Sequence, residues 1–147
     1  VSFETRRIRP DIQIGAAVSD EWTIWDVAGG ARSEGQAPVG WVQQGWVDYI
    51  WAMTYHNDYQ EFITHVDEHR QQMSPTHLAE CVVLYDQQDP SRPAAPEVVA
   101  PQVEYVLNNG LAGVCPFEYF YLQASPALQT WFTRIENSHL IYLPIIE

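Results

Sequence analysis

Lysine is absent from this sequence, and basic residues of any kind are few. All seven basic residues are arginine, against 19 acidic residues, so the formal net charge is −12. Without lysine, the chain cannot form a lysine Schiff base or hold phosphate with a P-loop lysine. The excess of negative charge predicts that neither nucleic acid nor an anionic membrane surface is a partner.

Long hydrophobic runs and cysteines are scarce as well. No stretch approaches the roughly 18 consecutive apolar residues of a membrane span, so no membrane-spanning segment is predicted. Cys81 and Cys115 each lie inside an apolar run, and we interpret both as small buried thiols rather than as a disulfide or a metal site. Two buried thiols do not indicate whether the protein works in an oxidising or a reducing compartment.

The length is also small. The 147 residues fall short of the roughly 250 residues of a complete (β/α)₈ barrel, which leaves one domain or a piece of one. The sequence starts at Val1 rather than Met, and residues 3–7 (FETRR) are typical of a helix already under way. We therefore expect residues 1–147 to be part of a longer chain.

Apolar material is ample for a core, at 46% hydrophobic and 13% aromatic residues. Four apolar runs predict strands, and helices are expected to follow them. The first two helices are expected to end near Gly45 and near Met73, the third to span residues 98–109 and the last to begin at Pro126. Residues 86–96, with three prolines, are predicted to be irregular. The predicted strands are residues 12–18, 46–55, 81–85 and 112–117.

Strands that alternate with helices predict a parallel α/β fold. An open doubly wound sheet and half of a (β/α)₈ barrel both fit this pattern. Gly29 and Gly30 do not match the G-x-G-x-x-G turn, which disfavours a nucleotide site. No cofactor is predicted, and the apolar run at residues 141–146 is not assigned to an element.

In either architecture, ligands bind at the carboxyl ends of the strands. Each predicted strand end offers a carboxylate and an aromatic ring. Paired carboxylates perform glycoside hydrolysis, and flat rings stack on the apolar faces of sugars, so a glycan is the predicted partner. The candidates for binding it are Glu21, Trp22, Tyr55, Tyr85, Asp86 and Tyr119.

The candidates for catalysis are Glu118, Asp58 and His56. Glu118 would be desolvated among aromatic residues if the site is closed, whereas Asp58 stands where a helix N-cap is also expected. Asp20, Glu21 and Asp86 also have simpler interpretations as capping or turn residues.

Two further histidines have a spacing that a metal site could use. His65 and His69 are one helical turn apart, but Asp67, Glu68 and Arg70 lie around them in the sequence. We therefore predict that both face solvent and that no metal is bound.

Residues 43–55 (QQGWVDYIWAMTY) resemble the sixth strand of the glycosyl hydrolase-like 10 family, which comprises bacterial (β/α)₈ barrels. Residues 8–15 (IRPDIQIG) and 109–117 (NGLAGVCPF) resemble the start of its fifth strand and its final strand. The similarity covers most of residues 4–132 and implies the C-terminal half of a barrel, strands five to eight.

The resemblance also implies roles for single residues. Tyr55 would line the sugar site, and Glu118 falls where the family often has a polar or acidic residue. His56 and Asp58 depart from the family pattern, and a carboxylate on the fourth strand would lie outside this chain. The implied function is a hydrolase-like domain acting on bacterial polysaccharide or cell-wall glycan, exported if the full protein carries a signal peptide.

Two other hypotheses are carried alongside the hydrolase. One is a non-catalytic carbohydrate-binding module. The other is self-association, because four parallel strands expose two unpaired edges and part of an apolar interior.

Overall fold

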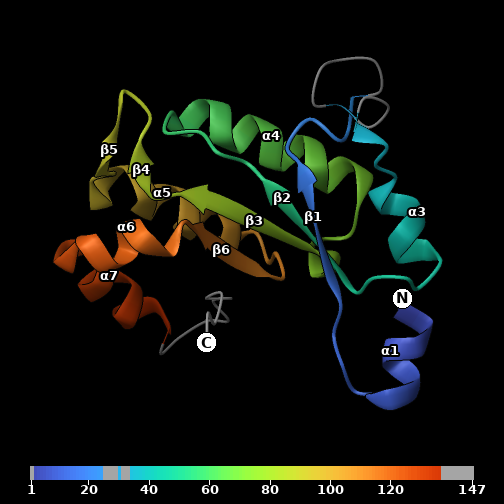
Figure 1. Cartoon of the computed structure of the whole chain (residues 1–147). Coiled ribbons are helices and arrows are strands. Elements are labelled where there is room, and N and C mark those ends of the chain that lie inside the picture. The colour runs from blue at the N-terminus through green and yellow to red at the C-terminus, as the bar shows by residue number, and fades with distance from the viewer. Residues whose placement is uncertain (1, 25–29, 31–33, 137–147) are drawn as a thin grey trace.

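The computed structural model describes residues 2–24, 30 and 34–136 and has an α/β fold (Figure 1). Four parallel strands form one sheet in the order β1-β2-β3-β6. All four predicted strands are therefore confirmed, with bounds shifted by a few residues. They are β1 (Gly15–Ser19), β2 (Tyr49–Met53), β3 (Leu78–Val83) and β6 (Gly113–Phe117).

Helices follow the strands, as the alternating pattern predicts. Proline stands in the first turn of α3 and of α5, where its missing N–H is not needed. Gly45 and Gly110 follow these two helices with positive φ, the conformation of a glycine helix stop. The helices are α1 (Ser2–Ile8), α3 (Pro38–Gln43), α4 (Tyr59–Gln72), η1 (Pro75–His77), α5 (Pro96–Asn108), α6 (Tyr119–Ala124) and α7 (Pro126–Glu136).

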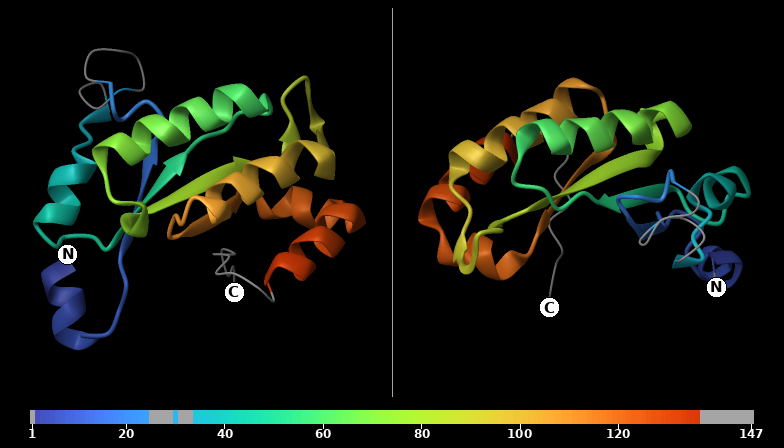
Figure 2. Two further views of the ribbon diagram at one scale, coloured as in Figure 1. Left: turned by 180° about the vertical axis from the view of Figure 1, so that it is seen from behind. Right: turned by 90° about the horizontal axis from the view of Figure 1, so that it is seen from above.

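The strand order repeats the chain order without a reversal. Helices α4 and α5 cover the same face of the sheet (Figure 2). A doubly wound sheet would instead reverse its order and carry helices on both faces. Among the residues that the structure describes, the arrangement is consistent with half of a (β/α) barrel.

The core lies between the sheet and helices α4 and α5. Side chains of alternate strand residues, including Val18, Ile50 and Ala52, are buried on this face together with Phe62 and Val103 from the two helices. The opposite face of the sheet, which we call the open face, carries Ala17, Trp51, Met53, Cys81 and Cys115.

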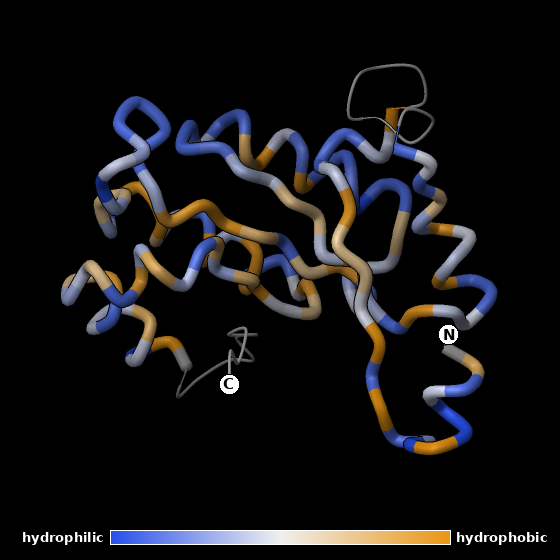
Figure 3. Tube along the Cα trace, viewed as in Figure 1, coloured by the Kyte–Doolittle hydropathy of each residue, from blue (hydrophilic) through white to orange (hydrophobic). Residues whose placement is uncertain are grey.

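The prediction of irregular structure for residues 86–96 is wrong. Strands β4 (Tyr85–Asp86) and β5 (Asp89–Pro93) form an antiparallel hairpin, and α5 begins at Pro96. Proline is tolerated in β5 because each strand of a two-stranded ribbon has an outer edge whose backbone N–H groups are not paired, and proline lacks only that N–H group. Figure 3 shows hydrophilic residues at the tip of the hairpin and hydrophobic ones along β3.

The structure adds a short helix, α6, that the sequence pattern did not predict. It packs against the hairpin, where the Tyr121 hydroxyl donates a hydrogen bond of 2.6 Å to the Pro90 carbonyl. Residues 141–146 lie outside the described residues. In the part of the chain described here, no helix combines the length and the apolarity that crossing a membrane requires.

Candidate functional site

A hollow of about 570 Å³ lies on the open face and extends from the middle of β1, β2 and β3 to the residues that follow β2 and β6. Aromatic side chains from β2, from the end of β6 and from α6 line it, and we call it the aromatic hollow. Tyr55 and Phe117 stack in its wall, with ring centroids 4.6 Å apart. Its lining includes Trp51, Met53, Tyr55, Phe117, Glu118 and Tyr119.

Tyr55 is a half-buried member of this wall. Burial is the main reason that the pKa of its hydroxyl lies well above the ordinary value, and neighbouring thiols, Tyr85 and Glu118 act in the same direction. The hydroxyl therefore stays protonated at neutral pH and can donate a hydrogen bond.

Glu118 lies in the aromatic hollow but is exposed. The closed site in which neighbouring aromatic residues would desolvate this carboxylate is therefore not present among the described residues. Phe117 and Tyr119 are each 37% exposed and Phe120 is 63% exposed, so these rings open toward solvent rather than closing over the carboxylate. The peptide bond between Phe117 and Glu118 is cis.

A second hollow, of about 500 Å³, lies between the end of β2, the start of α4 and the hairpin. It is polar, and we call it the polar hollow. Asn57 and Gln87 hold the hairpin against β2, because the backbone N–H of each donates to the side-chain oxygen of the other, at 2.7 and 2.6 Å. Its lining includes Asp58, Glu61, Asp86, Gln87 and Arg92.

Two predicted site residues in the polar hollow have structural contacts of their own. Asp58 is the N-cap of α4, with Oδ1 accepting from the Glu61 N–H at 2.8 Å. Asp86 Oδ1 accepts from the Gln88 N–H at 2.9 Å in the hairpin turn. These contacts are the capping and turn roles that the sequence left open as alternatives.

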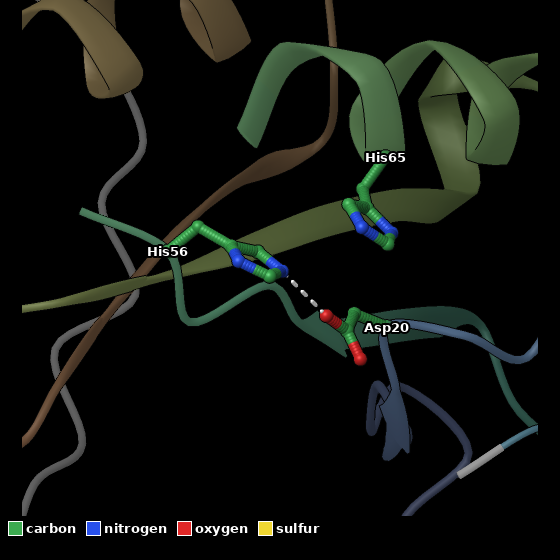
Figure 4. Close-up of side chains that lie close together, drawn as sticks. All are labelled: Asp20, His56 and His65. Atoms are coloured by element: carbon green, nitrogen blue, oxygen red, sulfur yellow. Dashed lines mark hydrogen bonds and ion pairs between the residues drawn. The ribbon is translucent and has the colours of Figure 1, made fainter. Parts of the chain in front are cut away.

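Asp20, His56 and His65 form a cluster (Figure 4). Asp20 follows the end of β1, His56 follows the end of β2, and His65 lies on α4. Nε2 of His56 lies 2.8 Å from Oδ2 of Asp20, and Nδ1 of His56 lies 3.2 Å from Oε2 of Glu61. The hydrogen bond to Asp20 is the main cause that raises the pKa of His56, against the opposing effect of burial.

The carboxyl group of Asp20 responds in the opposite direction. Burial alone would raise the pKa of Asp20, but the hydrogen bond with His56 and the charges of His65, His56 and His69 outweigh burial and lower it. The three histidines are therefore electrostatically linked to one carboxylate.

The prediction that His69 faces solvent is wrong, because its side chain is completely buried. Nδ1 lies 3.0 Å from Oε1 of the buried Glu80, and Nε2 lies 2.6 Å from the backbone oxygen of Asp20. Burial alone would lower the pKa of His69, but the charge and the hydrogen bond of Glu80, together with the contacts to Asp20, outweigh burial and raise it. His65, on the same helix, is half-buried.

Trp22 is also buried, at 4% exposed, and stacks on the ring of His69 with centroids 5.3 Å apart. Its contacts make it a core residue, which counts against the predicted stacking on a sugar. Glu21, beside it, is half-buried, and Tyr85 packs near Tyr121 under the hairpin with ring centroids 5.4 Å apart.

Cys81 and Cys115 lie side by side on β3 and β6, are not disulfide-bonded and both line the aromatic hollow. The thiol of Cys81 donates to Cys115, and this hydrogen bond lowers the pKa of Cys115 and raises that of Cys81. The interpretation of Cys81 as a buried thiol is confirmed, whereas Cys115 is half-buried.

The predicted site residues therefore lie in separate surroundings. Tyr55, Glu118 and Tyr119 share the aromatic hollow, Asp58 and Asp86 share the polar hollow, and His56 belongs to the histidine cluster. The three catalytic candidates therefore do not form one site, because Glu118 lines the aromatic hollow, Asp58 lines the polar hollow and His56 lines neither. Sequence reasoning missed Trp51, whose position in an apolar run suggested only a core residue.

A scan against protein-family models finds no match for this chain, and searches of curated proteins and of solved structures find no similar protein.

Proposed function

We propose that this chain is the C-terminal half of a (β/α)₈ barrel, similar to the glycosyl hydrolase-like 10 family, and that its aromatic hollow binds a bacterial polysaccharide or cell-wall glycan. The observation that carries the proposal is the aromatic hollow itself. It extends to the carboxyl ends of β2 and β6, and barrels of this kind bind their ligands at that end of the sheet.

The chemistry of the aromatic hollow fits a sugar. The rings of Tyr55 and Tyr119 offer flat apolar surface, and Glu118 and the Tyr55 hydroxyl offer an acceptor and a donor beside it. A net charge of −12 favours a neutral glycan over an anionic one, because an anionic chain would be repelled.

In a hydrolase, Glu118 would serve as the acid or as a polar contact to the sugar. Glycoside hydrolysis needs a second carboxylate across the scissile bond. Asp58 lies in the other hollow and caps α4, so we assign the second carboxylate to the part of a barrel that this chain does not include.

The test is an assay of the full-length protein and its Glu118→Gln variant on bacterial cell-wall and exopolysaccharide glycans. Loss of hydrolysis with retained binding supports a catalytic Glu118. Equal hydrolysis by both proteins removes Glu118 from the mechanism. Binding by both proteins without any turnover supports the carbohydrate-binding module instead.

A second candidate function is association through the sheet. β1 and β6 are the edges of the described sheet, and the open face between them carries apolar residues such as Ala17, Trp51 and Met53. Such edges and faces are normally covered. Light scattering on this chain tests the idea, since a stable monomer at high concentration contradicts self-association.

A further inference from the structure

We propose that Asp20, His56 and His65 form a binding site for one divalent transition-metal ion, with Zn²⁺ the best fit to the ligand set. This site is separate from the aromatic hollow and does not depend on the glycan proposal. It also departs from the expectation, drawn from the sequence, that no metal is bound.

The geometry of the three side chains carries the inference. One ligand atom from each of them lies within 4.8 Å of the other two (Figure 4). Around a tetrahedral Zn²⁺, ligand atoms about 2.0–2.2 Å from the ion lie about 3.3 Å from one another. The pair His56 Nε2 and Asp20 Oδ2, now 2.8 Å apart, needs to open slightly, and the His65 nitrogen, which lies within 4.8 Å of these atoms, needs to move toward them to complete the site.

The chemistry of the donors points to the same class of ion. Two imidazole nitrogens and one carboxylate oxygen suit Zn²⁺ and its neighbours in the first transition row, whereas Mg²⁺ and Ca²⁺ prefer oxygen ligands alone. Three protein ligands leave a fourth position for water, as in catalytic rather than structural zinc sites.

One ring nitrogen of His65 forms no hydrogen bond with the described residues. This atom is Nδ1, and it is buried. The ring of His65 stacks on that of His56, with centroids 4.8 Å apart and planes 14° apart, so one ring has to turn before both rings can point a nitrogen at the same ion. A buried nitrogen without a partner costs stability, and a bound ion is one way to recover that cost.

The surrounding residues hold the ligands in place, as they do around known metal sites. Oε2 of Glu61 lies 3.2 Å from Nδ1 of His56, and this ion pair turns Nε2 toward Asp20. Buried Gln102 donates to the His56 backbone oxygen at 2.7 Å, and buried His69 contacts the Asp20 backbone oxygen at 2.6 Å. The backbones of two of the three ligands are therefore anchored.

The test uses this 147-residue chain without a histidine tag, stripped of metal by a chelator and titrated with Zn²⁺ by calorimetry. We expect one ion per chain. Titration with Co²⁺ gives an independent readout, because coordination by four ligands produces strong visible absorption bands that an octahedral hydrated ion lacks.

Variants assign the site to its residues. Asp20→Asn and His65→Ala should each lower Zn²⁺ affinity at least tenfold, and Glu61→Gln should lower it about 10- to 100-fold, as outer carboxylates commonly do. Asp58→Asn is the matched control, since asparagine preserves the helix cap while removing a nearby carboxylate, and its affinity should not change.

Two results would overturn the proposal. The first is a wild-type chain that takes up no Zn²⁺ and gives no cobalt bands, which would leave the cluster as a hydrogen-bonded group only. The second is Zn²⁺ binding that survives unchanged in Asp20→Asn and His65→Ala. Far-UV circular dichroism of each variant shows that it is folded, and the cobalt spectrum of the wild type shows whether an ion is bound by four ligands, while the variants show which residues bind it.

Discussion

Nδ1 of His69 lies 3.0 Å from Oε1 of Glu80, and both side chains are completely buried. The pair joins α4 to β3. Thr54 donates to the other oxygen of Glu80 at 2.6 Å, and Nε2 of His69 faces the Asp20 backbone oxygen. Both nitrogens of His69 thus face acceptors, which favours the doubly protonated ring and explains why α4 is held over the sheet at this point.

The first prediction concerns this pair. Glu80→Gln should lower the free energy of unfolding by about 3–5 kcal/mol, because it leaves a buried charge on His69 without its partner. Urea denaturation followed by circular dichroism measures the change. A double variant with leucine at both positions should recover much of the loss, since no charge then stays buried. A cost below about 1 kcal/mol for Glu80→Gln would show that the pair contributes little.

The second prediction separates capping from catalysis at Asp58. Asp58→Ala should lower the free energy of unfolding by about 1 kcal/mol, because the Glu61 N–H loses its acceptor. Asp58→Asn should preserve stability, since asparagine caps helices as well as aspartate does. Denaturant unfolding of the two variants gives the comparison. An Asp58→Asn variant as unstable as Asp58→Ala would refute the capping role.

The third prediction concerns the two thiols. Cys115 should react with iodoacetamide before Cys81, because it is half-buried and because the hydrogen bond from Cys81 holds the pKa of Cys115 below its ordinary value of 9.0. The thiolate is the reactive form, so its alkylation rate should rise at a lower pH than that of a free cysteine. Mass spectrometry after timed alkylation at several pH values measures the order and the profile.

A variant at the donor checks the cause. Cys81→Ala removes the hydrogen bond, so the alkylation of Cys115 should shift to higher pH and slow at neutral pH. An unchanged profile in Cys81→Ala would mean that the thiol of Cys81 does not influence Cys115.

The sheet could be predicted from the sequence because its strands are nearly continuous apolar runs. All six residues of β3 are buried, and β2 carries apolar side chains on its open face as well as on the face covered by helices, so their sequences carry one strong signal rather than a weak alternation. Gly45 and Gly110 mark helix ends through their positive φ, which few other residues adopt readily. The β4–β5 hairpin was missed because proline normally argues against a strand, although an isolated ribbon tolerates it.

The side chains around the histidines could not be predicted in the same way. His69 shares the spacing of buried Phe62 and Val66, but Asp67 and Arg70 beside it favoured a solvent position. Its burial depends on Glu80, a charged residue inside an apolar strand that the sequence alone does not link to α4. Long-range pairs of this kind have no local signal, because each residue is ordinary in its own segment.

The central claim is that the aromatic hollow binds a glycan, and Tyr119 tests it most directly. Titration of a panel of neutral oligosaccharides into the full-length wild-type protein should find binding, and Tyr119→Ala should weaken it about tenfold, or about 1.4 kcal/mol. Tyr59→Ala is the matched control, since Tyr59 is similarly exposed, at 41% against 37% for Tyr119, but does not line the hollow. Equal binding by the two variants, or no binding by the wild type, would contradict the claim.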